Sequence, residues 1–162
     1  MTHRARLGLL GSAFVLLVLL TPPPASAGGG CLEEAAERVT VHPTLLRAIA
    51  WAESQGNPTA VNYNKDAAGK VTSYDYGLMQ INTWWHKQGL APVWHHLDDP
   101  CVNVAVGSWI LKQCVDQYGY AWNAIGCYNA GAGWEQSPKR RAAGLRYIRR
   151  IQKIVQAALQ AP

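Results

Sequence analysis

The residue with the clearest chemical potential is Glu53, a carboxylate near the end of an apolar helical segment. In "LLRAIAWAESQGNP", Leu46, Ile49 and Glu53 are separated by three and four residues, so a regular helix places them on one face. That face should point into the protein or into a cleft, where loss of hydration raises the pKa of a carboxyl group. The helix dipole acts in the same direction, because Glu53 lies in the last turn. The pattern therefore favours a general acid.

The same spacing is also compatible with a structural role for Glu53. A glutamate at a frayed helix end can pair with a base such as Arg47, or it can remain solvated. The spacing alone does not separate these two interpretations. The decision depends on which other polar residues the chain brings to Glu53.

The elements that would position Glu53 are mostly helical. Pro43 can open the segment "PTLLRAIAWAES", and Gly56 and Pro58 can end it. The stretch "AVNYNKDAAGKVTSYDYG" combines Val, Tyr and Thr with a centre rich in Asn, Asp and Gly, which is typical of a small hairpin or an ordered loop. Further helices are predicted over "CLEEAAERV", "LMQINTWW", a segment capped by Asp98, Asp99 and Pro100 that runs to about Tyr118, "AWNAIGCYNAG", and the residues from Lys139 onward. The fold class is therefore mainly α, with about six helices and one small β-hairpin or loop.

The N-terminus has the pattern of a secretory signal peptide. The basic stretch "MTHRAR" precedes an apolar run from Leu7 to Leu20, and "TPPPASA" ends in an Ala-x-Ala pattern. The apolar run is shorter than the roughly 20 residues that a membrane-spanning helix needs, although a retained anchor is the alternative. We predict cleavage after Ala27, with residues 1–27 as the signal peptide and residues 28–162 as one domain.

The charge of the chain is concentrated near its C-terminus. The full sequence has 15 Lys and Arg against 10 Asp and Glu, and seven of the bases lie between Lys139 and Lys153. A basic helix over residues 139–160 suits an anionic polymer or a membrane surface better than sequence-specific nucleic-acid binding. A solvated helix face explains the same residues equally well. We therefore predict no nucleic-acid partner.

Four cysteines in an exported chain of this size predict two disulfides. Cys101 and Cys114 fall in one predicted helix, where they would be roughly 20 Å apart, whereas a disulfide tolerates about 7 Å between Cα atoms. Either Cys31–Cys101 with Cys114–Cys127, or the crossed pairing, remains. The cysteines lack Cys-x-x-Cys spacing, and the aspartates of "WHHLDDP" are better explained as helix caps, so we predict no metal and no cofactor.

Three short motifs follow one another along the chain. "ES" lies at Glu53–Ser54, "GLMQIN" at 77–82 and "YNAG" at 128–131. Together they resemble the soluble lytic transglycosylase family, whose domain has an α+β, lysozyme-like fold. The stretches "YDYGLMQINTWW", "DPCVNVAVGSWIL" and "YGYAWNAIGCYNAG" are similar to the small exported members associated with type III and type IV secretion, conjugation and pilus systems. The resemblance covers about Cys31 to Ile154.

This resemblance implies cleavage of the β-1,4 bond between N-acetylmuramic acid and N-acetylglucosamine in peptidoglycan. Glu53 matches the family's catalytic acid, which protonates the glycosidic oxygen and then accepts the proton of the muramoyl 6-hydroxyl, giving a 1,6-anhydro product. Ser54 would help to orient that acid. The remaining residues implied to bind substrate are Gly77, Met79, Gln80, Tyr128, Asn129 and Tyr147.

Asp75 is the candidate for a second catalytic carboxylate. It lies two residues before Gly77, and the secretion-associated relatives tend to carry an acid at this place. It could stabilise positive charge at C1 of the sugar, or it could support hydrolysis by a muramidase. Its alternative role is that of a turn aspartate bonded to nearby backbone amides. A non-catalytic module that binds glycan or assists assembly of an apparatus is a further alternative, against which the presence of Glu53 argues.

The resemblance also bears on the cysteines, the location and the partners. Relatives with two cysteines favour the pair Cys31–Cys101, which leaves Cys114 with Cys127. We expect a periplasmic monomer that binds peptidoglycan glycan strands and serves a secretion, conjugation or pilus apparatus.

Among the tryptophans, Trp84, Trp85 and Trp134 are expected to stack on sugars. Trp109 and Trp122 fall at helical positions that predict a core role.

Overall fold

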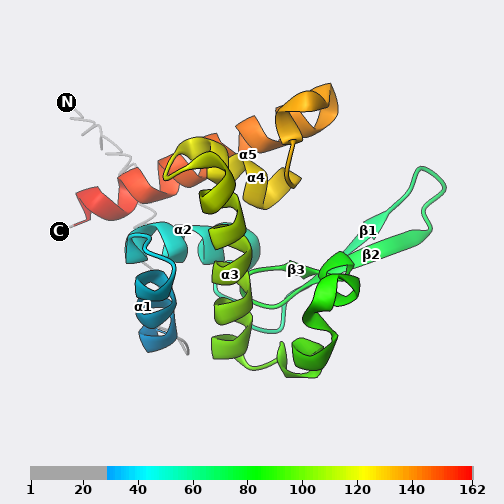
Figure 1. Cartoon of the computed structure of the whole chain (residues 1–162), viewed down its shortest axis with the longest axis horizontal. Helices are drawn as coiled ribbons and strands as arrows, with labels where there is room; N and C mark the ends of the chain where they lie inside the picture. Colours follow the sequence, from blue (N-terminus) through cyan, green and yellow to red (C-terminus); the bar gives the residue numbers. More distant parts are fainter. Residues whose placement is uncertain (1–28, 162) are drawn as a thin grey trace, which may run out of the picture.

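Helices make up most of residues 29–161, the part of the chain that this computed structural model describes (Figure 1). The α-helices are α1 (Gly29–Arg38), α2 (Pro43–Ser54), α3 (Pro100–Tyr118), α4 (Trp122–Ala130) and α5 (Pro138–Gln160), and the shorter helices are η1 (His86–Leu90), η2 (Ala91–His96) and η3 (Trp134–Gln136). The strands β1 (Val61–Lys65), β2 (Val71–Tyr76) and β3 (Ile81–Asn82) form an antiparallel sheet in that order. The predicted fold class, mainly α with a small β element, is confirmed. The expected signal peptide, residues 1–27, lies outside the described residues.

The helix that carries Glu53 has the predicted bounds. Pro43 occupies its first position, and the ring Nδ1 of His42 accepts a hydrogen bond from the Thr44 amide at 3.2 Å. Leu46 and Ile49 are completely buried on the face that leads to Glu53. The helix ends where Gln55 adopts a left-handed conformation at φ 55°. Glu53 is therefore held in the last turn, one turn beyond a buried apolar stripe.

Helix α3 runs through the middle of the molecule, with α1 and α2 on one side and the sheet on the other (Figure 1). The carboxylate of Asp99 caps it by accepting hydrogen bonds from the amides of Cys101 and Val102 at 2.7 and 3.2 Å. Val104 and Leu111 of α3 are completely buried. Because α3 packs against α1, α4, β3 and η2, it connects the helices to the sheet.

The β1–β2 hairpin projects away from the helices (Figure 1). Val61 pairs with Tyr76 and Asn62 pairs with Asp75, and the register shifts near the tip between Asn64 and Lys65. Asp66 closes the turn by accepting hydrogen bonds from two backbone amides. The sequence prediction of a small hairpin is thereby confirmed.

The segment "LMQINTWW", predicted to be a helix, is not one. Its first part is a turn, and Ile81 and Asn82 then form β3, so that helical backbone begins only at Trp84. Gln80 has a left-handed conformation at φ 48°, which a continuous α-helix does not permit. The backbone amide of Met79 donates to a side chain of α3 instead of to a carbonyl in its own segment. Tertiary hydrogen bonds therefore override the local helical pattern.

Two disulfides staple α3 to its neighbours. Cys31 pairs with Cys101, which joins α1 to the start of α3, and Cys114 pairs with Cys127, which joins α3 to α4. This is the pairing that the family resemblance favoured. Among residues 29–161, no helix is long and apolar enough to cross a bilayer.

The predictions for three of the tryptophans are wrong. Trp134, expected to stack on sugars, is 1% exposed and packs against Gly126 and Gly144, where any Cβ atom would lie 2.5 Å from its ring. Trp109 and Trp122, expected in the core, are each 42% exposed. The helices α3 and α4 are apolar on several sides, so residue spacing does not identify which apolar side chain points outward.

Candidate active site

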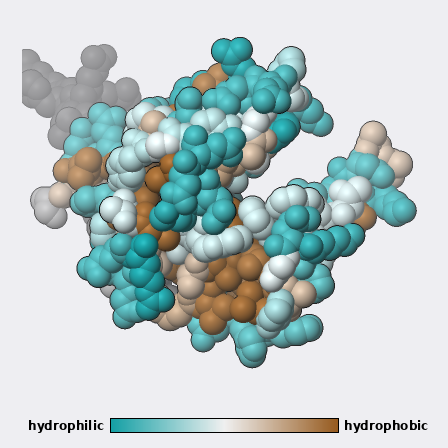
Figure 2. All heavy atoms as spheres, in the orientation of Figure 1, coloured by the Kyte–Doolittle hydropathy of each residue, from teal (hydrophilic) through white to brown (hydrophobic). Residues whose placement is uncertain are grey.

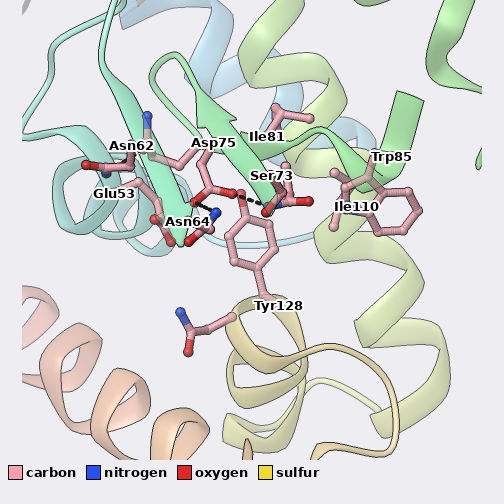
Figure 3. Close-up of a pocket in the computed structure, with 12 residues that line it drawn as sticks. Glu53, Asn62, Asn64, Ser73, Asp75, Ile81, Trp85, Ile110 and Tyr128 are labelled. Carbon is pink, nitrogen blue, oxygen red and sulfur yellow. Dashed lines mark hydrogen bonds between the residues drawn. The ribbon is translucent and has the colours of Figure 1, made fainter. Parts of the chain in front are cut away.

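A polar cavity of about 370 Å³ lies between the helices and the sheet. Figure 2 shows the molecule hollowed between the α4–α5 region and the projecting hairpin, and Figure 3 shows residues from both sides of this hollow turned toward one another. The cavity is lined by Glu53, Asn62, Asn64, Ser73, Asp75, Gln80, Ile81, Asn82, Trp85, Ile110, Tyr128 and Asn129. Six of the residues predicted to act on or bind substrate are in this set: Glu53, Asp75, Gln80, Trp85, Tyr128 and Asn129. The chain therefore brings together residues from three separate motifs.

Glu53 enters the cavity from the end of α2 and is only partly exposed. The pKa of its carboxyl group is raised from 4.5 to about 7, mainly by burial and to a smaller extent by the negative charge of Asp75. A hydrogen bond from Tyr147 and the positive charge of Arg150 oppose this rise in pKa. Arg47 does not pair with Glu53, since its guanidinium donates to Glu33 at 2.7 Å. The carboxyl group of Glu53 can therefore both donate and accept a proton near neutral pH.

Two tyrosines lie next to Glu53. Tyr147 donates its hydroxyl proton to Glu53 Oε1 at 2.5 Å, and its ring stacks on that of Tyr128 with 6.5 Å between the ring centroids. Burial and the nearby charge of Glu53 raise the pKa of both tyrosines well above the usual value, so both hydroxyls stay protonated as donors. Tyr128 lines the cavity and donates to the Met79 carbonyl at 2.8 Å. Tyr147 lies behind Glu53 and does not line the cavity.

Asp75 is fixed by side-chain amides from the strands on either side of it. Asn64 of β1 donates to Oδ2 at 2.9 Å (Figure 3). Asn82 of β3 donates to Oδ1 at 2.6 Å. Both oxygens of the carboxylate thus accept charge-assisted hydrogen bonds, which fix its orientation. Asp75 is therefore a strand residue facing the cavity, and not a turn aspartate bonded to backbone amides.

Asn64 and Asn82 were not among the residues predicted for the site. Asn62 and Asn64 alternate along β1, which places them on the same face of a strand. That alternation is a weak signal, because only the strand register reveals that Asn64 and Asn82 meet Asp75.

Gln80 lines the cavity but uses most of its amide to hold the loop before β3. Its Nε2 donates to the carbonyls of Ala60 and Gly77 at 3.1 and 2.8 Å, and its Oε1 accepts from Asn62 at 2.7 Å. These bonds stabilise the left-handed backbone of Gln80. Gln80 therefore shapes the wall of the cavity as well as facing it.

A buried asparagine on α3 fixes the same loop from below. Asn103 is completely buried, accepts from the Met79 amide at 2.8 Å, and donates to the carbonyls of Tyr76 and Leu97 at 3.0 and 3.1 Å. A Cβ atom on Gly77, whose φ is 78°, would lie 2.1 Å from the Asn103 amide nitrogen. Gly77 is therefore required by packing against Asn103, which was not predicted as part of the site.

The remaining predicted residues lie around the cavity in different ways. Met79 is completely buried and presents only its backbone carbonyl to Tyr128. Ser54 donates its hydroxyl to the Ala50 carbonyl within α2 at 3.1 Å. Asn129 is exposed near the end of α4 and lines the cavity.

A mainly helical fold with a small sheet, and a carboxyl group of raised pKa in a polar groove between them, are features of the lysozyme-like class. The family model described as "Transglycosylase SLT domain" matches residues 30–151, and the chain belongs to this family.

Known relatives align with most of the chain. Invasion protein IagB of Salmonella typhimurium is 37% identical over 142 residues, which covers 85% of this chain and 82% of the relative. Protein IpgF of Shigella flexneri is 36% identical over 125 residues, with 75% of this chain and 76% of the relative covered. A putative peptidoglycan-binding-like protein of Escherichia coli (strain K12) is 33% identical over 123 residues, with 73% and 78% covered.

Proposed function

We propose that this chain is a peptidoglycan lytic transglycosylase in which Glu53 is the general acid and then the general base. The observation that supports this proposal most is the pKa of about 7 for a carboxyl group that lines a polar cavity. A group with this pKa is present in both protonation states at neutral pH. Family membership gives the same substrate class, the glycan strands of peptidoglycan.

The proposed reaction uses one proton twice. Glu53 donates its proton to the glycosidic oxygen between N-acetylmuramic acid and N-acetylglucosamine as the bond from C1 to that oxygen breaks. The resulting carboxylate then removes the proton of the muramoyl 6-hydroxyl as that oxygen bonds to C1. The products are a 1,6-anhydromuramoyl end and a free 4-hydroxyl, and Glu53 is protonated again. The step consumes no water.

Asp75 is proposed to stabilise the positive charge that develops at C1. Its carboxylate faces the same cavity as Glu53 and is fixed in orientation by Asn64 and Asn82. A preorganised negative charge interacts more strongly with the transition state than with the neutral sugar. Tyr147 holds Glu53 in place through its hydroxyl, and Asn129 offers an amide to the substrate.

The fixed position of Asp75 also favours a second candidate function, that of a muramidase. Two carboxylates on one cavity can support hydrolysis through a glycosyl-enzyme intermediate, with water as the final acceptor. The two reactions leave different ends, because hydrolysis gives a reducing sugar and transglycosylation gives an anhydro sugar. Mass analysis of the released muropeptides separates them.

The cellular role that we propose is the opening of local gaps in the cell wall for an envelope-spanning secretion, conjugation or pilus apparatus. Residues 1–27 would direct export and be removed, and the two disulfides suit the oxidising periplasm. The support for an apparatus comes from relatives with names such as invasion protein IagB. The basic α5 would dock on the apparatus, the membrane or peptidoglycan itself.

The test of the proposed chemistry is the digestion of purified sacculi by the wild type and by Glu53→Gln. Glu37→Gln is the matched control, because Glu37 is exposed on α1 away from the cavity. We expect anhydro-muropeptides from the wild type and the control, and a loss of at least about 100-fold in Glu53→Gln. Unchanged turnover in Glu53→Gln would refute the assignment, and reducing ends in place of anhydro ends would establish the muramidase.

A further inference from the structure

Three tryptophans form a continuous aromatic array at one end of the cavity. Trp85 is the central member, with Trp84 at 4.8 Å and Trp109 at 5.7 Å between ring centroids, both in edge-to-face contact. Trp85 lines the cavity, whereas Trp84 is 55% exposed and Trp109 is 42% exposed. The array therefore begins inside the site and continues onto the surface.

The array is assembled from separate parts of the chain. Trp84 and Trp85 follow β3, and Trp109 comes from the middle of α3. The backbone amide of Trp84 donates to the side-chain oxygen of Asn82 at 2.8 Å, and the amide nitrogen of the same Asn82 holds Asp75. One asparagine thus fixes both the carboxylate in the cavity and the start of the exposed array.

The direction of the array fits an extended ligand. In Figure 3, Trp85 and Ile110 lie at the end of the cavity opposite Glu53 and Asn62. Beyond Trp85, Trp109 also lines a second cavity of about 690 Å³ between α1 and α3. A volume of about 370 Å³ is at the lower end of the range for small-molecule sites, about 300 to 1,000 Å³. A polymer bound in the first cavity must therefore continue over the neighbouring surface.

We propose that Trp84 and Trp109 extend the glycan-binding cleft, and that saccharide units beyond those in the cavity stack on their rings. This proposal rests on the part of the proposed function that makes peptidoglycan glycan the ligand of the cavity. The apolar face of a pyranose ring matches the flat apolar surface of an indole, whose N–H can still bond to a hydroxyl. A glycan is favoured over a protein partner because Trp85 belongs to both the cavity and the array, so a protein docked there would obstruct the cleft.

The test compares Trp84→Ala, Trp109→Ala and the double variant on two substrates, long peptidoglycan glycan strands and a tetrasaccharide. The matched control is Trp122→Ala, because Trp122 is also 42% exposed and lines a different pocket, beside Tyr120. The preference is the ratio of kcat/KM for long strands to kcat/KM for the tetrasaccharide. We expect each variant of the array to lower this ratio about fivefold, by raising KM for long strands while kcat stays unchanged. The control should keep the wild-type preference.

A binding measurement separates this proposal from the proposed function. In the Glu53→Gln background, cosedimentation with peptide-free glycan strands should weaken about fivefold when Trp84 or Trp109 is also replaced, and should not change with Trp122→Ala. If the wild type cleaves no glycan but binding still depends on the array, the proposed function fails and the extension stands. If cleavage proceeds while strand preference and binding are unchanged in the variants, the extension is overturned. Circular dichroism checks that each variant is folded.

Discussion

Replacing Glu53 by glutamine should stabilise the folded chain at neutral and alkaline pH and leave its stability at acidic pH unchanged. Burial raises the pKa of Glu53 from the ordinary value of 4.5 to about 7. The folded state therefore binds this proton more tightly than the unfolded state. The contribution of Glu53 to stability is fully present below pH 4.5 and is lost as the pH rises to about 7.

The size of this effect follows from the interval between the two pKa values. Each pH unit across that interval removes about 1.4 kcal/mol of stability, so the wild type loses about 3 kcal/mol by pH 7. Glutamine has nearly the same shape, does not ionise, and can still accept the hydrogen bond from Tyr147. Glu53→Gln should therefore avoid this loss.

Thermal unfolding followed by circular dichroism at about pH 4.5, 6 and 8 measures the effect. The midpoint of Glu53→Gln should match that of the wild type at the lowest pH and exceed it by on the order of 10 °C at the highest. Glu37→Gln on α1 is the control and should follow the wild type throughout. A difference in unfolding midpoint between Glu53→Gln and the wild type that is the same at every pH would refute the reasoning. Folding would then not favour the protonated form of the Glu53 carboxyl group.

Three further predictions follow from hydrogen bonds and packing. Tyr147→Phe removes a hydrogen bond that stabilises the charged form of Glu53 and lowers its pKa. The alkaline limb of the pH profile of kcat/KM should therefore move to a pH higher by about one unit. A limb that stays in place would contradict this role of Tyr147. Asn82→Ala frees one oxygen of Asp75 and should lower kcat/KM on sacculi about tenfold; a wild-type rate would show that this amide is dispensable. Gly77→Ala should lower the free energy of unfolding in urea by more than about 3 kcal/mol, because its φ is 78° and its Cβ would meet the buried asparagine of α3. Gly69→Ala is the matched control for strain alone, since its φ is 79° in open space, and it should lower that free energy by only about 1 kcal/mol.

The helices that carry local signals could be predicted from the sequence. α2 has the expected bounds because Pro43 starts it and a left-handed residue after Ser54 ends it, both of which are local effects. α3 begins where Asp99 and Pro100 predicted. The loop from Gly77 to Gln80 could not be predicted, because its conformation depends on side chains that are distant in the sequence.

The candidate site also combines features that one segment determines with features that depend on the packing of distant segments. Helical spacing placed Glu53 on an inward-facing side of its helix, which is a property of one segment, and the motifs "ES", "GLMQIN" and "YNAG" then favoured it as the acid. The partners of Asp75 could not, since Asn64 and Asn82 meet it only through the register of three strands. The exposure of Trp109 also could not be predicted, because it depends on which side of α3 its neighbours leave uncovered. In each case the missing information is the placement of one segment against another.

The bond from Tyr128 to the Met79 carbonyl joins α4 to the loop before β3 across the base of the cavity. Asn103 fastens the same loop to α3. The opposite sides of the groove are therefore held at a set width before any saccharide arrives. A groove of fixed width admits ligands whose thickness matches it. It loses little conformational entropy on binding, and it needs no closing motion before the reaction begins.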